Sequence, residues 1–196
     1  MIIYLDTETT GLRPGKICQL SYLIQSGNKI REKNFFFSVD YVESGALAVH
    51  GFSVPRLKVL SKGKKFCDFI DEIEKDFNDA DLIVSHNTSF DFMFLDKEFT
   101  DCGRVFPREK GFCSMKNSVT ICKLSRTNHR GYKYPKLSEL CGYIGVSDDY
   151  LLSKTEEYFE EKCGYHDARF DTTAVCIACN LLMNSREQFS ILKDYL

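Results

Sequence analysis

The order of strand-forming and helix-forming segments along the chain constrains its fold most strongly. Three strand-like runs come first: a short apolar run rich in strand formers at residues 2–5, and two further runs at 17–25 and 29–39. Ser26-Gly27-Asn28 separates the second run from the third and is typical of a hairpin connection. Strand and helix segments then alternate toward the C-terminus. This order predicts an α/β fold in which helices flank a mixed β-sheet.

The clearest helical periodicity lies between Lys64 and Phe77, where five apolar residues recur at helical spacing. Residues 7–15 are expected to form a turn. The other expected elements are a strand at 81–85, a helix at 90–99, a short strand near Phe112, helices at 116–123, 136–144 and 167–183, and a C-terminal helix after Ser185. No repeat or low-complexity linker interrupts the chain, so residues 1–196 are expected to form one domain.

Several classes of protein are not favoured. No apolar run approaches the roughly 18 residues that a membrane helix needs, and the segment Met1–Asp6 lacks the basic region of a signal peptide. The 9 cysteines are odd in number and scattered, so a disulfide framework is not expected. Cys176 and Cys179 form a CxxC pair without a second ligand pair nearby, which favours buried thiols over a metal or redox site. We therefore expect a cytoplasmic chain with reduced thiols and no membrane partner.

Two acidic residues stand at the end of the first predicted strand. Asp6 and Glu8 are two positions apart, so on an extended chain their side chains point to the same face. Neighbouring carboxylates repel each other unless a cation lies between them. The alternative is a solvated strand end, because an acid-x-acid pattern is common.

Two more acids and a histidine fall at the starts of predicted helices. Asp91 lies in the first turn of the helix after the 81–85 strand. It could be a third carboxylate of the site, or it could be there only because the helix dipole stabilises an acid in the first turn. Asp171 lies on a helix that is otherwise apolar, so its charge needs a partner, for which a metal is suitable. His166 precedes that helix and is interpreted as a proton acceptor beside the acids.

Taken together, these residues form the pattern Asp-x-Glu, Asp and His-x-Ala-x-x-Asp. The chain resembles the DEDDh family of 3′→5′ exonucleases, and within it the epsilon-like proofreading branch of bacterial DNA polymerases. The resemblance extends over nearly the whole chain. The matching segments are Asp6-Thr7-Glu8-Thr9-Thr10-Gly11-Leu12, His50-Gly51-Phe52, His86-Asn87-Thr88-Ser89-Phe90-Asp91, Lys136-Leu137-Ser138-Glu139-Leu140-Cys141 and His166-Asp167-Ala168-Arg169-Phe170-Asp171.

The resemblance implies a ribonuclease-H-like fold and a phosphodiesterase that uses two Mg²⁺ or Mn²⁺ ions. Asp6 would bridge both ions, with Glu8 and Asp171 on the first and Asp91 on the second. His166 would take the proton of the attacking water. The products would be nucleoside 5′-monophosphates released from a 3′ end.

The similarity of the segments around residues 50–52 and 136–141 favours DNA as the substrate. The same chemistry on RNA, as in the oligoribonuclease and RNase T branches, is an alternative, because the acidic residues are common to both. A nucleic-acid-binding module that keeps the fold without turnover is a second alternative. The presence of all five catalytic positions argues against it.

The resemblance also implies contacts with the terminal nucleotide. These would come from Thr7, Leu12, His50, Asn87 and Phe90. Other roles remain open for three of them, because Leu12 could be an exposed turn residue, His50 a helix-end residue and Phe90 a core residue.

Charge is distributed unevenly along the chain. The 28 acidic and 26 basic residues give a formal charge of −2, which alone does not favour a nucleic-acid binder. No acid lies between Glu109 and Glu139, however, while the bases there are Lys110, Lys116, Lys123, Arg126, Arg130, Lys133 and Lys136. His129, Tyr132 and Tyr134 lie among them, a mixture that suits single strands or frayed 3′ ends; a solvated basic loop is the alternative.

An acidic segment, 148–162, precedes His166 and is longer than the connection usual in epsilon-like proteins. It could form a helix that restricts access to the site or a surface addition. The sequence identifies no polymerase-binding segment, so a replicative polymerase remains only a possible partner.

Overall fold

The computed structural model describes residues 1–127, 130–164 and 166–196. Within these residues the chain forms a five-stranded mixed sheet of order β3-β2-β1-β4-β5. β2 is antiparallel to both of its neighbours, whereas β1, β4 and β5 run parallel to one another. The strands are β1 (Ile2–Thr9), β2 (Ile17–Ser26), β3 (Lys29–Phe36), β4 (Leu82–Ser85) and β5 (Gly111–Cys113).

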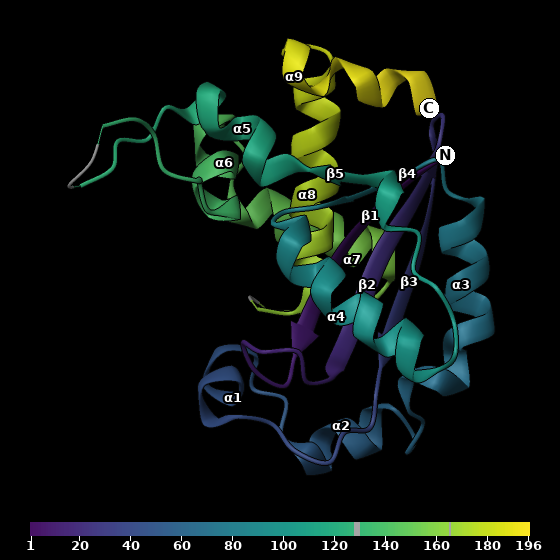
Figure 1. The fold of residues 1–196 in the computed structure, drawn as a ribbon. Coiled ribbons are helices and arrows are strands. Elements are labelled where there is room, and N and C mark those ends of the chain that lie inside the picture. Colours follow the sequence, from purple (N-terminus) through teal and green to yellow (C-terminus); the bar gives the residue numbers. More distant parts are fainter. Residues whose placement is uncertain (128–129, 165) are drawn as a thin grey trace.

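Helices cover both faces of this sheet (Figure 1). The α-helices are α1 (Ser44–His50), α2 (Val54–Leu60), α3 (Ile70–Asp79), α4 (Thr88–Asp101), α5 (Ser114–Cys122), α6 (Leu137–Tyr143), α7 (Asp148–Phe159), α8 (Ala168–Met183) and α9 (Glu187–Ser190). Short 3-10 helices are η1 (Phe66–Phe69), η2 (Arg108–Lys110) and η3 (Ile191–Tyr195). The α/β fold class expected from the sequence is therefore confirmed.

Side-chain alternation along β1 divides the core into two layers. Ile3 and Leu5 pack with the apolar faces of α3 and α4, whereas Ile2 and Tyr4 pack with α8 and the helices beside it. Successive side chains of a strand point to opposite faces, so a strand covered on both sides is apolar throughout. The same alternation directs Asp6 and Glu8 toward α8.

Two helices were not expected from the sequence, and a third forms in a segment for which a helix was one of two alternatives. α1 and α2 occupy a stretch for which no element was expected, and each is only seven residues long. α7 forms within the acidic segment 148–162, where it packs against α8 and β3. Its buried face consists of Leu151, Thr155 and Phe159, while its acidic residues are exposed. The segment is therefore a packed layer of the fold.

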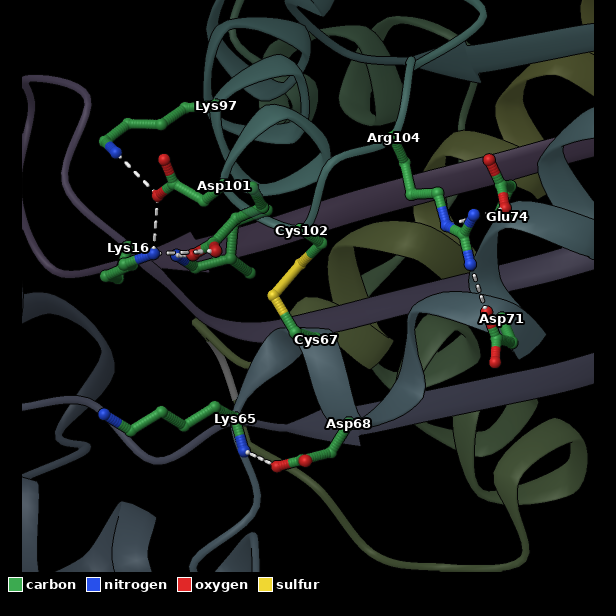
Figure 2. Close-up of a disulfide and its surroundings, with 12 residues drawn as sticks. Lys16, Lys65, Cys67, Asp68, Asp71, Glu74, Lys97, Asp101, Cys102 and Arg104 are labelled. Atoms are coloured by element: carbon green, nitrogen blue, oxygen red, sulfur yellow. Dashed lines mark hydrogen bonds and ion pairs between the residues drawn. A yellow bond between two sulfur atoms is a disulfide. The ribbon is translucent and has the colours of Figure 1, made fainter.

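The expectation of uniformly reduced thiols is wrong for one pair, because Cys67 of η1 and Cys102 after α4 form a disulfide (Figure 2). Their Cα atoms are 5.4 Å apart although 35 residues separate them in sequence, so spacing along the chain carries no signal of the pairing. Cys176 and Cys179 are free and buried in α8, as predicted. Within the described ranges no helix has the length and apolar character needed to cross a bilayer.

Candidate active site

Three predicted acids meet where the end of β1 faces the first turn of α8. Asp6 and Glu8 come from β1 and Asp171 comes from α8. One carboxylate oxygen from each residue can be chosen so that all three lie within 4.8 Å of one another. The pairing of β1 with β2 shifts register between Glu8 and Thr9, and such irregularities commonly redirect side chains beside functional sites.

Crowding and burial oppose ionisation of this cluster. Burial, followed by the charge of Asp171, raises the pKa of Asp6 well above its ordinary value. The same two causes, in the same order, raise the pKa of Glu8 to about 9. Burial also raises the pKa of Asp171 to about 6, although the charge of His166 acts in the opposite direction. The carboxylates therefore repel one another when ionised, and a bound cation would reduce this repulsion.

Asp91 lies beside this group but is held from the other side of the sheet. It occupies the first turn of α4, is 3% exposed, and accepts a 2.8 Å hydrogen bond from the Thr7 hydroxyl. Its charge contributes to the raised pKa values of Asp6 and Glu8. Burial raises its own pKa to about 6, so it belongs electrostatically to the same cluster.

No lysine or arginine forms an ion pair with these four acids in the part of the chain that the structure describes. Buried carboxylates without a basic partner need a metal ion or protons. Oxygen ligands favour hard divalent cations such as Mg²⁺ and Mn²⁺. The residues present therefore fit the divalent metal that the sequence predicted.

His166 lies next to the cluster, two residues before α8 begins. Its side chain is exposed, and its charge lowers the pKa of Asp171, which places it within electrostatic range of the acids. Its φ of 57° lies in the left-handed region, which is uncommon for residues other than glycine. An exposed imidazole at this position can exchange a proton with water above the acids.

A pocket of about 350 Å³ opens beside Glu8. Its lining includes four of the five residues predicted to contact a nucleotide, namely Thr7, Leu12, His50 and Phe90. Asn87 is not part of this lining; it precedes α4 with a φ of 92°. Leu12 is 81% exposed, which leaves its side chain available at the pocket rim.

His50 differs from its predicted role in one respect. Its Nδ1 accepts the backbone N–H of Phe52 at 3.0 Å, so its Nε2 carries the hydrogen and donates to the carbonyl oxygen of Thr9 at 3.2 Å. Burial lowers the pKa of this imidazole. Both ring nitrogens therefore serve the fold, and His50 lines the pocket without a free nitrogen for a ligand.

Two contributions to the site were missed from the sequence. Glu43 lines the pocket and packs so closely on Gly11 that a Cβ there would lie 2.3 Å from its carboxylate. Gln19 and Arg169 join the start of α8 to β2 through buried hydrogen bonds to Asp167. The position of Gln19 gave no distinct signal of this role, because the same strand also contains Ser21 and Gln25.

Comparison with known proteins bears on these features. The RNase_T model, described as Exonuclease, matches residues 3–177. The DNA polymerase III subunit epsilon of Salmonella typhimurium is 30% identical over 131 residues, covering 62% of this chain and 52% of the relative. The subunit epsilon of Rickettsia conorii is 28% identical over 211 residues, covering 96% of this chain and 87% of the relative. The chain thus spans about half the length of the Salmonella relative.

Solved structures support the fold. The metal-free form of the complex between Escherichia coli ExoI and single-stranded DNA has a TM-score of 0.72 and 15% identity. The match covers 98% of this chain and 42% of that one. A zinc-bound form of the same complex has a TM-score of 0.69 and 16% identity. The expected ribonuclease-H-like fold is confirmed.

Proposed function

The chain belongs to the exonuclease family, and from that membership we propose that it is a metal-dependent 3′→5′ exonuclease acting on DNA. The observation that carries the proposal is the convergence of Asp6, Glu8 and Asp171 within 4.8 Å at the edge of a nucleotide-sized pocket. The products are nucleoside 5′-monophosphates, removed one at a time from the 3′ end.

The acids divide into two ligand sets. Asp6, Glu8 and Asp171 would hold one Mg²⁺ or Mn²⁺ ion, and Asp6 with Asp91 would hold the second. When bound, the two ions stabilise the charge that develops on the attacking and leaving oxygens of the phosphate. The hydrogen bond from Thr7 leaves one oxygen of Asp91 oriented by the protein, so this ligand is positioned before a metal arrives.

His166 is the general base of the proposed reaction. An unprotonated ring nitrogen of His166 takes the proton from the attacking water, and the exposed position of the side chain lets it return that proton to solvent.

The pocket beside Glu8 accepts the terminal nucleotide. Leu12, Val49 and Phe90 supply apolar surface for the base and sugar. Its volume of about 350 Å³ lies at the small end of the range for ligand pockets and suits one nucleotide. We therefore expect a single-stranded or frayed 3′ end to be the preferred substrate.

The basic segment 110–136 provides the path for the rest of the strand. Tyr132 and Tyr134 are 42% and 53% exposed and can stack on bases. His86 ties the segment to the sheet through a 2.9 Å hydrogen bond to the carbonyl oxygen of Pro135. Lys110 is excluded from this role, because its ammonium donates to the carbonyl oxygens of residues 78 and 80 at 2.8 Å. His129 lies outside the described residues.

The test is a time course on DNA strands labelled at the 3′ or the 5′ end, on mismatched duplex and on RNA, with and without Mn²⁺. We expect the 3′ label to leave first as a mononucleotide, the 5′ label to report a descending ladder, and DNA to be degraded faster than RNA. Asp6→Asn protein purified in parallel controls for contaminating nuclease. Absence of mononucleotide, or equal release by the variant, would refute the proposal, and faster degradation of RNA would replace DNA by the exoribonuclease alternative.

A further inference from the structure

A buried polar network joins β2 to the start of α8 directly behind the acid cluster. We propose that Gln19, Asp167 and Arg169, called here the α8 clamp, are positioning residues that hold His166 and Asp171 at a fixed distance from Glu8. This inference rests on the proposed function, because it concerns the same metal site and the same general base.

Gln19 is the link to the sheet. It is fully buried on β2, and its Cα pairs in register with that of Glu8 on β1. Its Nε2 donates to Asp167 Oδ1 and to Asn34 Oδ1, both at 2.9 Å, and its Oε1 accepts the backbone N–H of Ala168 at 3.1 Å. Every hydrogen of the amide group is therefore used, and two of its bonds end on the first residues of α8.

Asp167 and Arg169 complete the clamp. Asp167 caps α8 by accepting the backbone N–H of Arg169 at 3.1 Å. The Arg169 guanidinium binds both oxygens of this carboxylate, with Nε 2.9 Å from Oδ1 and Nη2 2.8 Å from Oδ2. Bidentate pairing of this kind fixes the orientation of both groups. It also compensates a charge that would otherwise add to the repulsion among the neighbouring acids.

Two members of the clamp, Asp167 and Arg169, lie in sequence between the two residues that the clamp positions. His166 immediately precedes Asp167, and Asp171 follows one helical turn later. Movement of Asp167 would therefore displace the general base and the metal ligand together. Groups behind a metal site that orient its ligands in this way commonly change affinity or activity about 10- to 100-fold when they are replaced.

The same two elements provide a matched control. Farther along β2 and α8, Gln25 and Asn180 exchange two amide hydrogen bonds of 3.0 and 2.9 Å. Gln25 is also buried, so its replacement removes the same chemical group from the same interface. Gln25 pairs with Ile2, near the end of β1 that is opposite to Glu8. A difference in activity or metal affinity between the Gln19 and Gln25 variants is therefore due to the position of the replaced side chain relative to the site.

The experiment compares Gln19→Met with Gln25→Met in the full chain. Both variants are expected to lose similar thermal stability. Gln19→Met should also lower kcat on single-stranded DNA about 10- to 100-fold with little change in KM, and weaken Mn²⁺ binding, measured by calorimetry without DNA, about 10-fold. Gln25→Met should keep wild-type kcat and Mn²⁺ affinity. Equal kcat and Mn²⁺ affinity in the two variants would overturn the clamp.

Arg169→Lys is the second variant, and it decides the question if Gln19→Met does not fold. Lysine keeps the charge but cannot bind both oxygens of Asp167, so we expect a smaller loss of kcat and of Mn²⁺ affinity in the same direction. Wild-type values in Arg169→Lys would overturn the clamp. A wild-type protein that binds Mn²⁺ but releases no nucleotide would refute the exonuclease, while the Mn²⁺ affinities of the variants would still test the clamp.

Discussion

Two regions of this molecule contain fully or partly buried carboxylates, and they differ in what surrounds them. Glu98 on α4 is 2% exposed and accepts the backbone N–H of Ile17 at 2.9 Å. Its other oxygen lies 3.1 Å from the Lys16 ammonium, which also reaches Asp101 at 2.7 Å (Figure 2). Asp6, Glu8 and Asp171 converge without any such ion pair among the described residues.

This difference separates a structural acid from a candidate ligand. Glu98 has a cation and a backbone donor, so its charge connects β2 to α4 and is neutralised within the protein. The acids at the end of β1 have one another and the nearby His166, so their repulsion is left for an added cation to remove. Glu98 is more deeply buried than Asp6, Glu8 and Asp171, but the presence of a basic partner is what distinguishes the chemistry of the two regions.

The largest expected effect comes from removing a central acid. Asp6→Asn keeps the size of the side chain but removes one charge from the cluster. Because metal ions supply several kcal/mol of transition-state stabilisation, kcat should fall on the order of 10³-fold. Single-turnover release of nucleotide from labelled single-stranded DNA measures the loss, and near wild-type activity would remove Asp6 from the site.

The next effect concerns two histidines, His166 beside the acids and His50 in the pocket lining. His166→Asn should lower kcat on the order of 10²-fold, because the reaction loses a positioned proton acceptor. His50→Asn should act mainly on thermal stability, since both ring nitrogens of His50 already bind backbone groups. Measuring kcat and melting temperature for both variants separates the roles, and a larger kcat loss at His50 would reverse the assignment.

Metal-free protein should show the repulsion as a pH dependence of stability. Raised pKa values mean that the folded chain keeps protons on Asp91 and Asp171 up to about pH 6, and on Glu8 up to about pH 9. The unfolded chain releases them near pH 4. The free energy of unfolding contributed by these acids should therefore fall as pH rises between these values.

Calorimetry in chelator at pH 5 and pH 9 measures this decrease. Asp6→Asn is the control, because the titration of groups elsewhere in the chain contributes equally to the stability of both proteins. The wild type should lose more stability than the variant toward pH 9, and Mn²⁺ should restore it in the wild type only. A wild type that gains stability relative to the variant would contradict the proposed repulsion.

The smallest effect is expected at the structural acid. Glu98→Gln keeps an oxygen for the N–H of Ile17 but loses the charged pair with Lys16. We expect a loss of about 1–2 kcal/mol in unfolding free energy, because one charge-assisted bond is weakened, and kcat within about 2-fold of wild type. Denaturant unfolding and the nucleotide-release assay provide these values, and a loss of activity comparable to that of Asp6→Asn would erase the contrast between the two regions.

The sequence predicted the elements whose signals are local. An apolar run marked β1, the Ser26-Gly27-Asn28 connection marked the hairpin of β2 and β3, and helical spacing marked α3. The candidate acids were found because Asp6 and Glu8 share one strand face and because Asp171 interrupts an apolar helix. These signals depend only on residues close together in the chain.

What the sequence did not predict depends on distant residues. Cys67 and Cys102 pair across 35 residues, and Gln19 meets Asp167 across 148. The seven-residue helices α1 and α2 are too short for a clear hydrophobic period. The Nδ1 of His50 is occupied locally by the N–H of Phe52, but the hydrogen bond from its Nε2 to Thr9 becomes visible only when α1 is placed against the end of β1.

The most direct test of the central claim is anomalous diffraction at the manganese edge from crystals of the protein grown with Mn²⁺ and a nucleoside 5′-monophosphate. We predict two manganese peaks at the end of β1, one bound by Asp6, Glu8 and Asp171 and the other by Asp6 and Asp91, with the phosphate between them and His166. Crystals without manganese at these carboxylates, or with a lysine or arginine side chain placed among them, would contradict the account.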